Sequence, residues 1–372
     1  MKQILLNPGP ANTTDAVKKA MTADDICPRE VEFGEVMKRV GEGLVRVVHQ
    51  GSDYVSVLFG GSGTAAVEAA LASTVRPEGR LLVINNGAYG QRMVEIAAQY
   101  RMAHDQVDFG VGAWPDPSRA REMLGKQRYT QVAVVHHETT TGMLNPVEEI
   151  ARAAHEHGAD VIVDAMSSYA GVPIDVAAMG ADYLVSSANK CIQGMAGLSF
   201  VIADKQKLEK LTTIPGRSLY LDLAAQHRFF EKSLQMRFTP PVQILYALDQ
   251  ALTEFFAEGQ AARHQRYLAC FEALDSGVRR LGFRRLLPEA MLSRILTAYL
   301  EPDHPKYSYD AMHDHLRRRG FTIYPGKGAK RATFRLANMG AITPQDMQRF
   351  VAALESTIEE MAIRPLYHEV GV

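Results

Sequence analysis

The residues from Tyr54 to Gly197 alternate short apolar runs, glycine turns and helical patterns, and this rhythm constrains the fold more than any other feature. Runs such as VSVLF and VIVD have the length and β-branched composition of strands that are buried on both faces. Turns follow them, and then segments with apolar residues at helical spacing, as in GTAAVEAAL. We therefore predict an α/β fold with a mainly parallel sheet covered by helices.

The chain has 372 residues, of which 47% are hydrophobic, and this is enough for two domains. A long helix is expected from Val242 to Leu281, and beyond it the strand patterns SRILTAYL, FTIYPGK and TFRLANMG alternate with helices. We predict an N-terminal arm at residues 1–14, a large domain at residues 15–255 and a smaller C-terminal α+β domain at residues 256–372. The arm contains the sequence NPGP, which neither a helix nor a central strand accommodates.

The charge balance excludes several classes of partner. Lys plus Arg is 41 and Asp plus Glu is 42, so a nucleic-acid surface is not expected. The apolar runs are too short for a signal peptide or a membrane span, which favours a cytoplasmic protein with no membrane partner. The cysteines, Cys27, Cys191 and Cys270, are odd in number and widely spaced, so we expect neither a disulfide framework nor a metal site.

Two charged residues follow neighbouring strand patterns. Asp164 ends the run VIVD, and Lys190 comes shortly after the run from Tyr183 to Ser187. Ligands of parallel sheets lie beyond the carboxyl ends of the strands, so both residues could face one site. Enzymes that use pyridoxal phosphate (PLP) need a lysine that holds the aldehyde as a Schiff base and an acid that keeps the pyridine nitrogen protonated. For an isolated pair, a capping aspartate and a solvated lysine are the simpler interpretation.

Glycines at positions 60, 61 and 63 lead directly into a helical pattern. Such a turn offers backbone N–H groups and a positive helix end to a phosphate, and Ser62 and Thr64 add hydroxyl donors. The chain has neither the GxxxxGK[ST] pattern nor a GxGxxG pattern with a later ribose-binding acid. A plain tight turn is the alternative interpretation.

Two further turns contain side chains that suit a flat heterocyclic ligand. Tyr89 follows a strand pattern in NNGAYGQRM and could stack on a ring, although packing is the more common role of such an aromatic. Thr139 begins a run of three threonines after the strand QVAVVHHE, and their hydroxyls are useful donors. A threonine turn without a ligand is the alternative.

Seven segments, in this order, resemble the class V aminotransferases of PLP fold type I: GGSGTAAVEA, NNGAYGQRM, HHETTTGMLNP, VDAMSS, SSANKCIQG, TPP and FRLANMG. The resemblance covers nearly the whole chain. It implies a PLP-dependent transferase that acts as a homodimer on small-molecule substrates. ETTTGMLNP, VDAMSS and SSANKCIQG are most similar to the members of the family that transfer the amino group of 2-aminoethylphosphonate to pyruvate in phosphonate catabolism.

The resemblance also implies roles for individual residues. Lys190 would form the Schiff base and move protons, Asp164 would pair with the pyridine nitrogen, and Tyr89 would stack on the ring. The other cofactor contacts that it implies are Ser62, Gly63 and Thr64 at the phosphate, Thr139 at the polar edge of the ring, Gln193 beside the lysine, and Thr239 at the phosphate of the neighbouring subunit.

Substrate binding is assigned to two arginines. Arg335, in FRLANMG, matches the arginine that binds the acidic group of the substrate in the family. Arg29, in CPREVEF, is either a second anion contact or a structural salt-bridge partner.

Other functions remain open from the residues alone. The same scaffold suits an alanine:glyoxylate or serine:pyruvate aminotransferase, or a transaminase or lyase that acts on another aminophosphonate. A regulatory module that binds a phosphate at GGSGT without chemistry is the alternative from a different class, although such a binder has no use for both Asp164 and Lys190.

Overall fold

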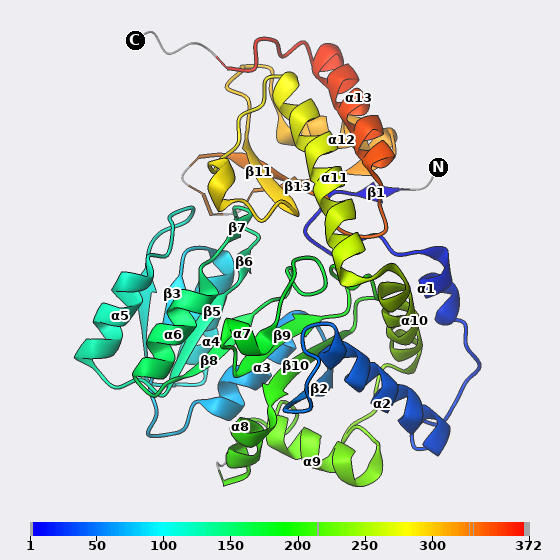
Figure 1. Ribbon diagram of the computed structural model, residues 1–372. Coiled ribbons are helices and arrows are strands. Elements are labelled where there is room, and N and C mark those ends of the chain that lie inside the picture. The colour runs from blue at the N-terminus through cyan, green and yellow to red at the C-terminus, as the bar shows by residue number, and fades with distance from the viewer. Residues whose placement is uncertain (1–2, 214–215, 327, 330, 368–372) are drawn as a thin grey trace.

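A computed structural model describes residues 3–213, 216–326, 328–329 and 331–367 (Figure 1). Its centre is a seven-stranded sheet in which β10 is antiparallel to both of its neighbours and the remaining strands are parallel. The prediction of a mainly parallel α/β sheet is therefore confirmed. The strands, in their order across the sheet, are β2 (Tyr54–Gly60), β10 (Leu198–Asp204), β9 (Tyr183–Ser187), β8 (Asp160–Asp164), β5 (Gln131–Val135), β3 (Leu81–Asn85) and β4 (His104–Asp108).

Helices cover both faces of this sheet, which explains why its central strands are apolar along their whole length. Leu81 and Val83 of β3 belong to a core that includes residues of α3 and α4. Leu82 and Ile84 point to the other face and pack in a core with residues of α2, α5, α6 and α10. The helices in the part of the chain that contains this sheet are α1 (Asp15–Ala20), α2 (Val31–Arg46), α3 (Gly63–Thr74), α4 (Ala88–Gln99), α5 (Pro117–Lys126), α6 (Val147–Glu156), α7 (Val176–Met179), α8 (Lys205–Lys210), α9 (Leu223–Ser233) and α10 (Val242–Glu258).

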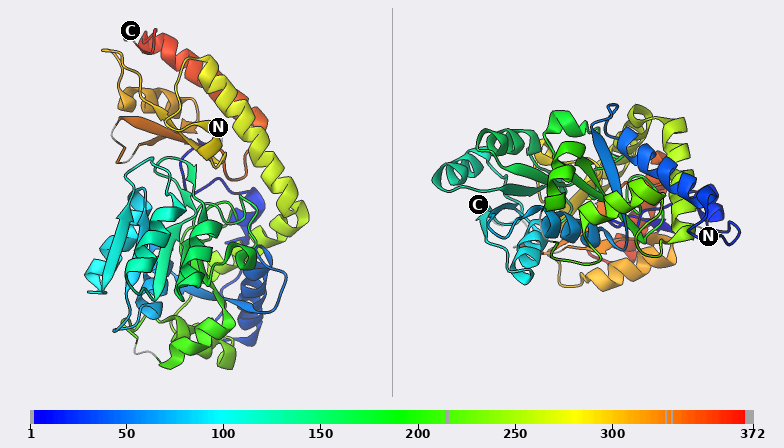
Figure 2. Two further views of the ribbon diagram at one scale, coloured as in Figure 1. Left: turned by 60° about the vertical axis from the view of Figure 1, so that its left-hand side comes forward. Right: turned by 90° about the horizontal axis from the view of Figure 1, so that it is seen from below.

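The C-terminal part has its own core around a three-stranded antiparallel sheet of order β11-β14-β13. The helices α11 and α13 run side by side along one flank of this sheet (Figure 2). This arrangement is the α+β architecture that the sequence predicts, while the exact domain boundaries at 14/15 and 255/256 stay a prediction. The elements are α11 (Gln260–Arg280), β11 (Leu296–Leu300), α12 (Tyr309–Arg318), β12 (Phe321–Thr322), β13 (Tyr324–Pro325), β14 (Thr333–Ala337) and α13 (Pro344–Met361).

The prediction of one long helix from Val242 to Leu281 is wrong. The chain turns at Gly259, whose φ of 83° lies in the left-handed region, and this residue separates α10 from α11. Glycine enters that region at little steric cost, so a single glycine ends one helix and begins the next. The last residue of the expected strand segment FTIYPGK, Lys327, lies outside the described residues.

The N-terminal arm connects the two parts of the molecule. Its strand β1 (Ile4–Leu5) pairs in parallel with β12 of the C-terminal part, and the Leu6 carbonyl accepts a 2.7 Å hydrogen bond from the N–H of Ala337, at the end of β14. Further along the arm, the N–H of Ala11 donates a hydrogen bond to the carbonyl of Asn189, in the part that contains the seven-stranded sheet. The arm therefore lies between β14 and the turn that contains Lys190.

Among the helices that the described residues form, none has both the length and the apolar character of a membrane span. Within the same residues, no cluster of three or more His, Cys, Asp or Glu side chains is arranged to hold a metal ion.

Candidate active site

Asp164 and Lys190 lie at or just beyond the carboxyl ends of neighbouring parallel strands, as the sequence predicts. Asp164 is the last residue of β8 and lies opposite Val185 of β9, and Lys190 comes three residues after the end of β9. Burial lowers the pKa of Lys190 to about 8, and the charge of nearby Asp164 counteracts part of this effect. A lysine with such a pKa exchanges protons near neutral pH, which an exposed lysine does not do readily.

Asp164 is a buried acid, only 5% exposed. Its Oδ1 accepts a 2.9 Å hydrogen bond from the N–H of Met166. Burial raises the pKa of Asp164, while this bond and the positive charges of Arg92 and Lys190 favour the ionised form. A cation placed against this carboxylate would therefore compensate for the cost of burying it.

The glycine turn leads into the N-terminus of α3. Ser62 is the N-cap residue and is exposed, and its side chain caps no N–H group within the described chain. A Cβ on Gly63 would overlap the end of the Met166 side chain, so this turn packs closely against the segment after Asp164. The start of α3 therefore offers uncapped backbone donors, which is the usual environment of a bound phosphate.

Tyr89 lies at the start of α4, and Arg92 packs against it. The Arg92 guanidinium carbon is 4.9 Å from the centroid of the Tyr89 ring, and Arg92 Nη1 donates a 3.3 Å hydrogen bond to Thr64 Oγ1. Arg92 thus links the predicted ring-stacking residue to the predicted phosphate turn. Arg92 was not among the residues predicted from the sequence, although its position one helical turn after Tyr89 was a usable signal.

Arg335 and Thr139 are brought together from the two parts of the chain. Arg335 is 3% exposed on β14, and its Nη1 donates a 3.0 Å hydrogen bond to the carbonyl of Thr139. Its Nε donates to the carbonyl of Pro325 at 3.0 Å, and the ring centroid of Tyr324 is 5.1 Å from the guanidinium carbon. These two hydrogen bonds use two of the five N–H groups of the guanidinium, so they fix its plane and leave donors for an acidic ligand.

The N-terminal arm contacts Lys190 directly. Lys190 Nζ donates a 2.5 Å hydrogen bond to the carbonyl of Pro8. Gly9 has a φ of 132°, and a Cβ there would overlap the end of the lysine side chain, with Cε only 2.7 Å away. The predicted arm is therefore part of the site. This contact could not be predicted from local sequence patterns, because 182 positions separate Pro8 from Lys190.

Gln193 and Thr239, two further residues predicted to contact the cofactor, differ in their exposure. Gln193 is buried in the turn after Lys190 with a φ of 68°, and its side-chain amide donates a 2.8 Å hydrogen bond to the Tyr267 hydroxyl of α11. Thr239 is exposed at the surface. Their roles at a cofactor stay predictions.

Arg29 is exposed at the start of α2 and contacts the segment that precedes Thr239. Its Nη1 donates to Gln235 Oε1 at 2.7 Å and to the carbonyl of Met236 at 3.3 Å. Both acceptors are neutral, and a role of Arg29 as a second anion contact or as a salt-bridge partner stays a prediction.

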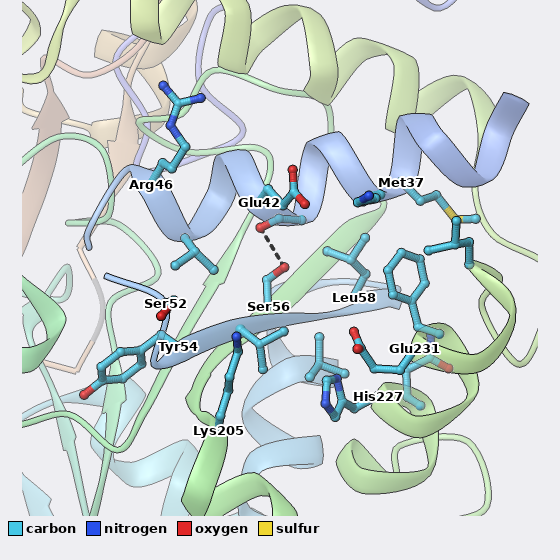
Figure 3. A pocket seen from close by; sticks show the side chains of 18 of the residues that line it. Met37, Glu42, Arg46, Ser52, Tyr54, Ser56, Leu58, Lys205, His227 and Glu231 are labelled. Atoms are coloured by element: carbon cyan, nitrogen blue, oxygen red, sulfur yellow. Dashed lines mark hydrogen bonds between the residues drawn. The ribbon is translucent and has the colours of Figure 1, made fainter. Parts of the chain in front are cut away.

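A cavity of about 750 Å³ lies elsewhere, between α2, β2 and α9 (Figure 3). Its lining includes both cationic and acidic side chains, among them Lys205, His227 and Glu231. The described residues that line it are all different from the predicted site residues. The candidate active site is therefore defined by the contacts around Lys190, Asp164 and Arg335.

Comparison with known proteins identifies the family of this chain. The model of the family described as aminotransferase class-V matches residues 25–315. The chain is 46% identical to a 2-aminoethylphosphonate–pyruvate transaminase of Syntrophobacter fumaroxidans over 95% of this chain and 96% of the relative. It is 43% identical to a 2-aminoethylphosphonate–pyruvate transaminase of Vibrio cholerae over 95% of this chain and 97% of the relative.

Among solved structures, an alanine–glyoxylate aminotransferase from Nostoc sp. is similar, with a TM-score of 0.90 and 26% identity over 96% of each chain. The family match covers more than half of the sequence, and the relatives cover nearly all of it. The chain belongs to the class V aminotransferases.

Proposed function

We propose that this enzyme transfers the amino group of 2-aminoethylphosphonate to pyruvate, with PLP as its cofactor, giving phosphonoacetaldehyde and alanine. The relatives at 46% and 43% identity support this substrate pair by their names. The structural observation that carries the proposal is Arg335, a buried guanidinium whose orientation is fixed by hydrogen bonds to the carbonyls of Thr139 and Pro325. It would bind an acidic group at a distance from the reacting amine.

The residues fit PLP. The uncapped N-terminus of α3 suits the phosphate, and the buried Asp164 suits a protonated pyridine nitrogen, which would add a positive charge to those of Arg92 and Lys190 near this carboxylate. Lys190, with its lowered pKa, is available to bond to the aldehyde. Tyr89 and Thr139 would contact the ring.

When bound, PLP supplies an electron sink for the negative charge that develops on the substrate carbon. Asp164 favours this role by stabilising positive charge at the pyridine nitrogen. Lys190, once its amine is free, accepts a proton at Nζ and releases it again, which a pKa of about 8 permits near neutral pH.

The substrate requires a remote anchor, because its reacting carbon has no carboxylate. Arg335 meets this need since its planar fork holds a tetrahedral oxyanion at two points. The hydrogen bonds from Arg335 to the carbonyls of Thr139 and Pro325 keep that fork in one orientation before the substrate arrives.

An exposed apolar patch supports the homodimer as the active form. Leu219 is 77% exposed, and the rings of Tyr220 and Phe238, both at the surface, lie 5.2 Å apart. The Tyr220 hydroxyl donates to the carbonyl of Gly60, at the start of the phosphate turn, so the patch adjoins the site. A second copy would bury these side chains and bring Thr239 toward the site of its neighbour.

The test is an assay of amino donors and acceptors with spectral monitoring. The purified enzyme should turn over 2-aminoethylphosphonate with pyruvate much faster than alanine with glyoxylate, and Lys190→Ala should abolish both turnover and the visible absorbance of the Schiff base between PLP and the lysine. A Lys190→Ala variant that stays yellow and active would refute the assignment. Faster turnover of alanine with glyoxylate would indicate an alanine–glyoxylate aminotransferase instead.

A further inference from the structure

Glu138 is a fully buried acid for which the proposed mechanism has no use. It lies in the short strand β6 (His137–Glu138), which pairs with β7 (Met143–Leu144), and its exposed fraction is 0%. It immediately precedes Thr139, the residue whose carbonyl holds Arg335. A carboxyl in such a position requires hydrogen-bond donors, and their identity indicates what it does.

The donors to Glu138 come from its own turn and from the start of α4. Oε1 accepts from the N–H of Thr140 at 3.0 Å and from the Thr140 hydroxyl at 2.5 Å. Oε2 accepts from the N–H of Tyr89 at 3.3 Å, and Thr140 Oγ1 accepts from the N–H of Ala88 at 3.0 Å. The first two N–H groups of α4 are therefore capped by a segment some fifty positions further along the chain.

This cap replaces a local one. The N-cap residue of α4 is Gly87, which has no side chain that could accept a hydrogen bond. A Cβ at Gly87 would overlap Glu138, whose Oε2 lies 2.7 Å from that position. The missing side chain thus permits the carboxyl to reach the helix end, where negative charge is favourable.

The turn that contains Glu138 and Thr140 also contacts Arg335, the predicted substrate-binding residue. Thr139 lies between the two capping residues, so the side chains of Glu138 and Thr140 hold α4 while the carbonyl of Thr139 holds Arg335. A shift of Glu138 would move both partners at once.

We infer that Glu138 is a positioning residue that fixes the positions of Tyr89 and Arg335 relative to each other. One buried carboxyl would thus position both the residue that stacks on the cofactor ring and the residue that binds the phosphonate. The inference rests on the proposed function, in which Tyr89 stacks on PLP and Arg335 binds the substrate.

The variant Glu138→Gln tests it. Glutamine keeps the shape and the volume but replaces one acceptor oxygen with an NH₂ group, which cannot accept from an N–H. Loss of one charge-assisted bond predicts an increase of about tenfold in the dissociation constant of PLP, measured on the apoenzyme by fluorescence titration. The visible circular dichroism of bound PLP should weaken, and the KM for 2-aminoethylphosphonate should rise more than kcat falls.

Two further variants complete the design. Thr140→Val removes the second cap and should shift the same quantities in the same direction, while Thr140→Ser, which retains the hydroxyl, should remain near the wild type. Glu122→Gln removes an exposed acid on α5, paired with Lys126, and serves as the matched control that changes none of them.

The outcomes separate this inference from the proposed function. If Glu138→Gln lowers only the melting temperature, with the PLP affinity, the circular dichroism and the KM unchanged, the role is structural and the inference is overturned. If Glu138→Gln does not fold, Thr140→Val against Thr140→Ser decides the same question. If the wild type binds PLP but does not use 2-aminoethylphosphonate, the proposed function fails while the PLP titration still tests Glu138.

Discussion

The Nζ of Lys190 and the carbonyl oxygen of Pro8 are 2.5 Å apart, so the residue expected to bind the cofactor has a hydrogen-bond partner in the N-terminal arm. The carbonyl gives the amine a fixed direction when it is not bonded to a ligand. The arm in turn is held by β12 and by the end of β14.

Gly9→Ala should strongly lower the turnover of the enzyme. The new Cβ would overlap the lysine side chain, and the φ of 132° is unfavourable for alanine. We expect kcat to fall by about a hundredfold, corresponding to about 3 kcal/mol in the barrier, because small displacements of a catalytic group are costly. Steady-state kinetics and the absorbance of bound PLP measure this. Gly125→Ala, on α5 with open space around the new Cβ, is the control and should be active.

Lys190 should react as a neutral amine at unusually low pH. Burial lowers its pKa to about 8, so its protonated fraction in the apoenzyme falls around that pH, well below the value of about 10.4 for an exposed lysine. Reductive methylation of the apoenzyme, followed by peptide mass spectrometry, should give a midpoint near pH 8 for Lys190. A midpoint near 10 would contradict the burial that the structure shows.

The same shift has a consequence for stability. Between pH 8 and about 10.4 the unfolded chain binds more protons at this residue than the folded chain does, so the free energy of unfolding should rise with pH in this window. Lys190→Met should remove that rise, which urea titrations of the two apoproteins at pH 8 and pH 10 would measure.

Arg335→Lys should weaken substrate binding more than it slows turnover. An ammonium cannot hold a phosphonate at two points, and it also loses the geometry of the bonds to the carbonyls of Thr139 and Pro325. The KM for 2-aminoethylphosphonate should increase by about tenfold or more, with a smaller change for pyruvate. Arg318→Lys, exposed on α12, provides the comparison. Unchanged kinetics would remove Arg335 from the site.

Phe238→Asp should dissociate the proposed homodimer. A charge in the exposed apolar patch opposes its burial against a second copy. Size-exclusion chromatography with light scattering should show a monomer of about half the mass of the wild type, with reduced PLP affinity if Thr239 reaches the neighbouring site. Lys19→Asp, on the exposed face of α1, is the control for a charge change elsewhere. A wild-type monomer would contradict the proposal outright.

The sequence predicts the sheet well because local patterns determine it. The apolar runs fix the strands, and the rule that ligands lie beyond the carboxyl ends of parallel strands places Asp164 and Lys190 together, as observed. The antiparallel direction of β10 was not predicted, since periodicity shows that a strand exists and not which way it runs.

The remaining features depend on contacts between distant positions. Gly259 interrupts a region with helical periodicity on both sides, so the pattern alone favoured one helix. The cap of α4 by Glu138, the bond between Pro8 and Lys190 and the bond between Arg335 and Thr139 join residues 49, 182 and 196 positions apart. No local propensity encodes such pairs, because tertiary packing decides them.

The parallel pairing of β1 with β12 also bears on biosynthesis. Residues 4–5 are made early, whereas their partners at residues 321–322 and the N–H of Ala337 are made more than 300 positions later. During translation β1 therefore has no strand partner while the seven-stranded sheet forms. The arm is held at both of these partners only after the C-terminal strands have left the ribosome, so a chain truncated before β12 would contain both Lys190 and Pro8 but not the strands that hold the arm in place.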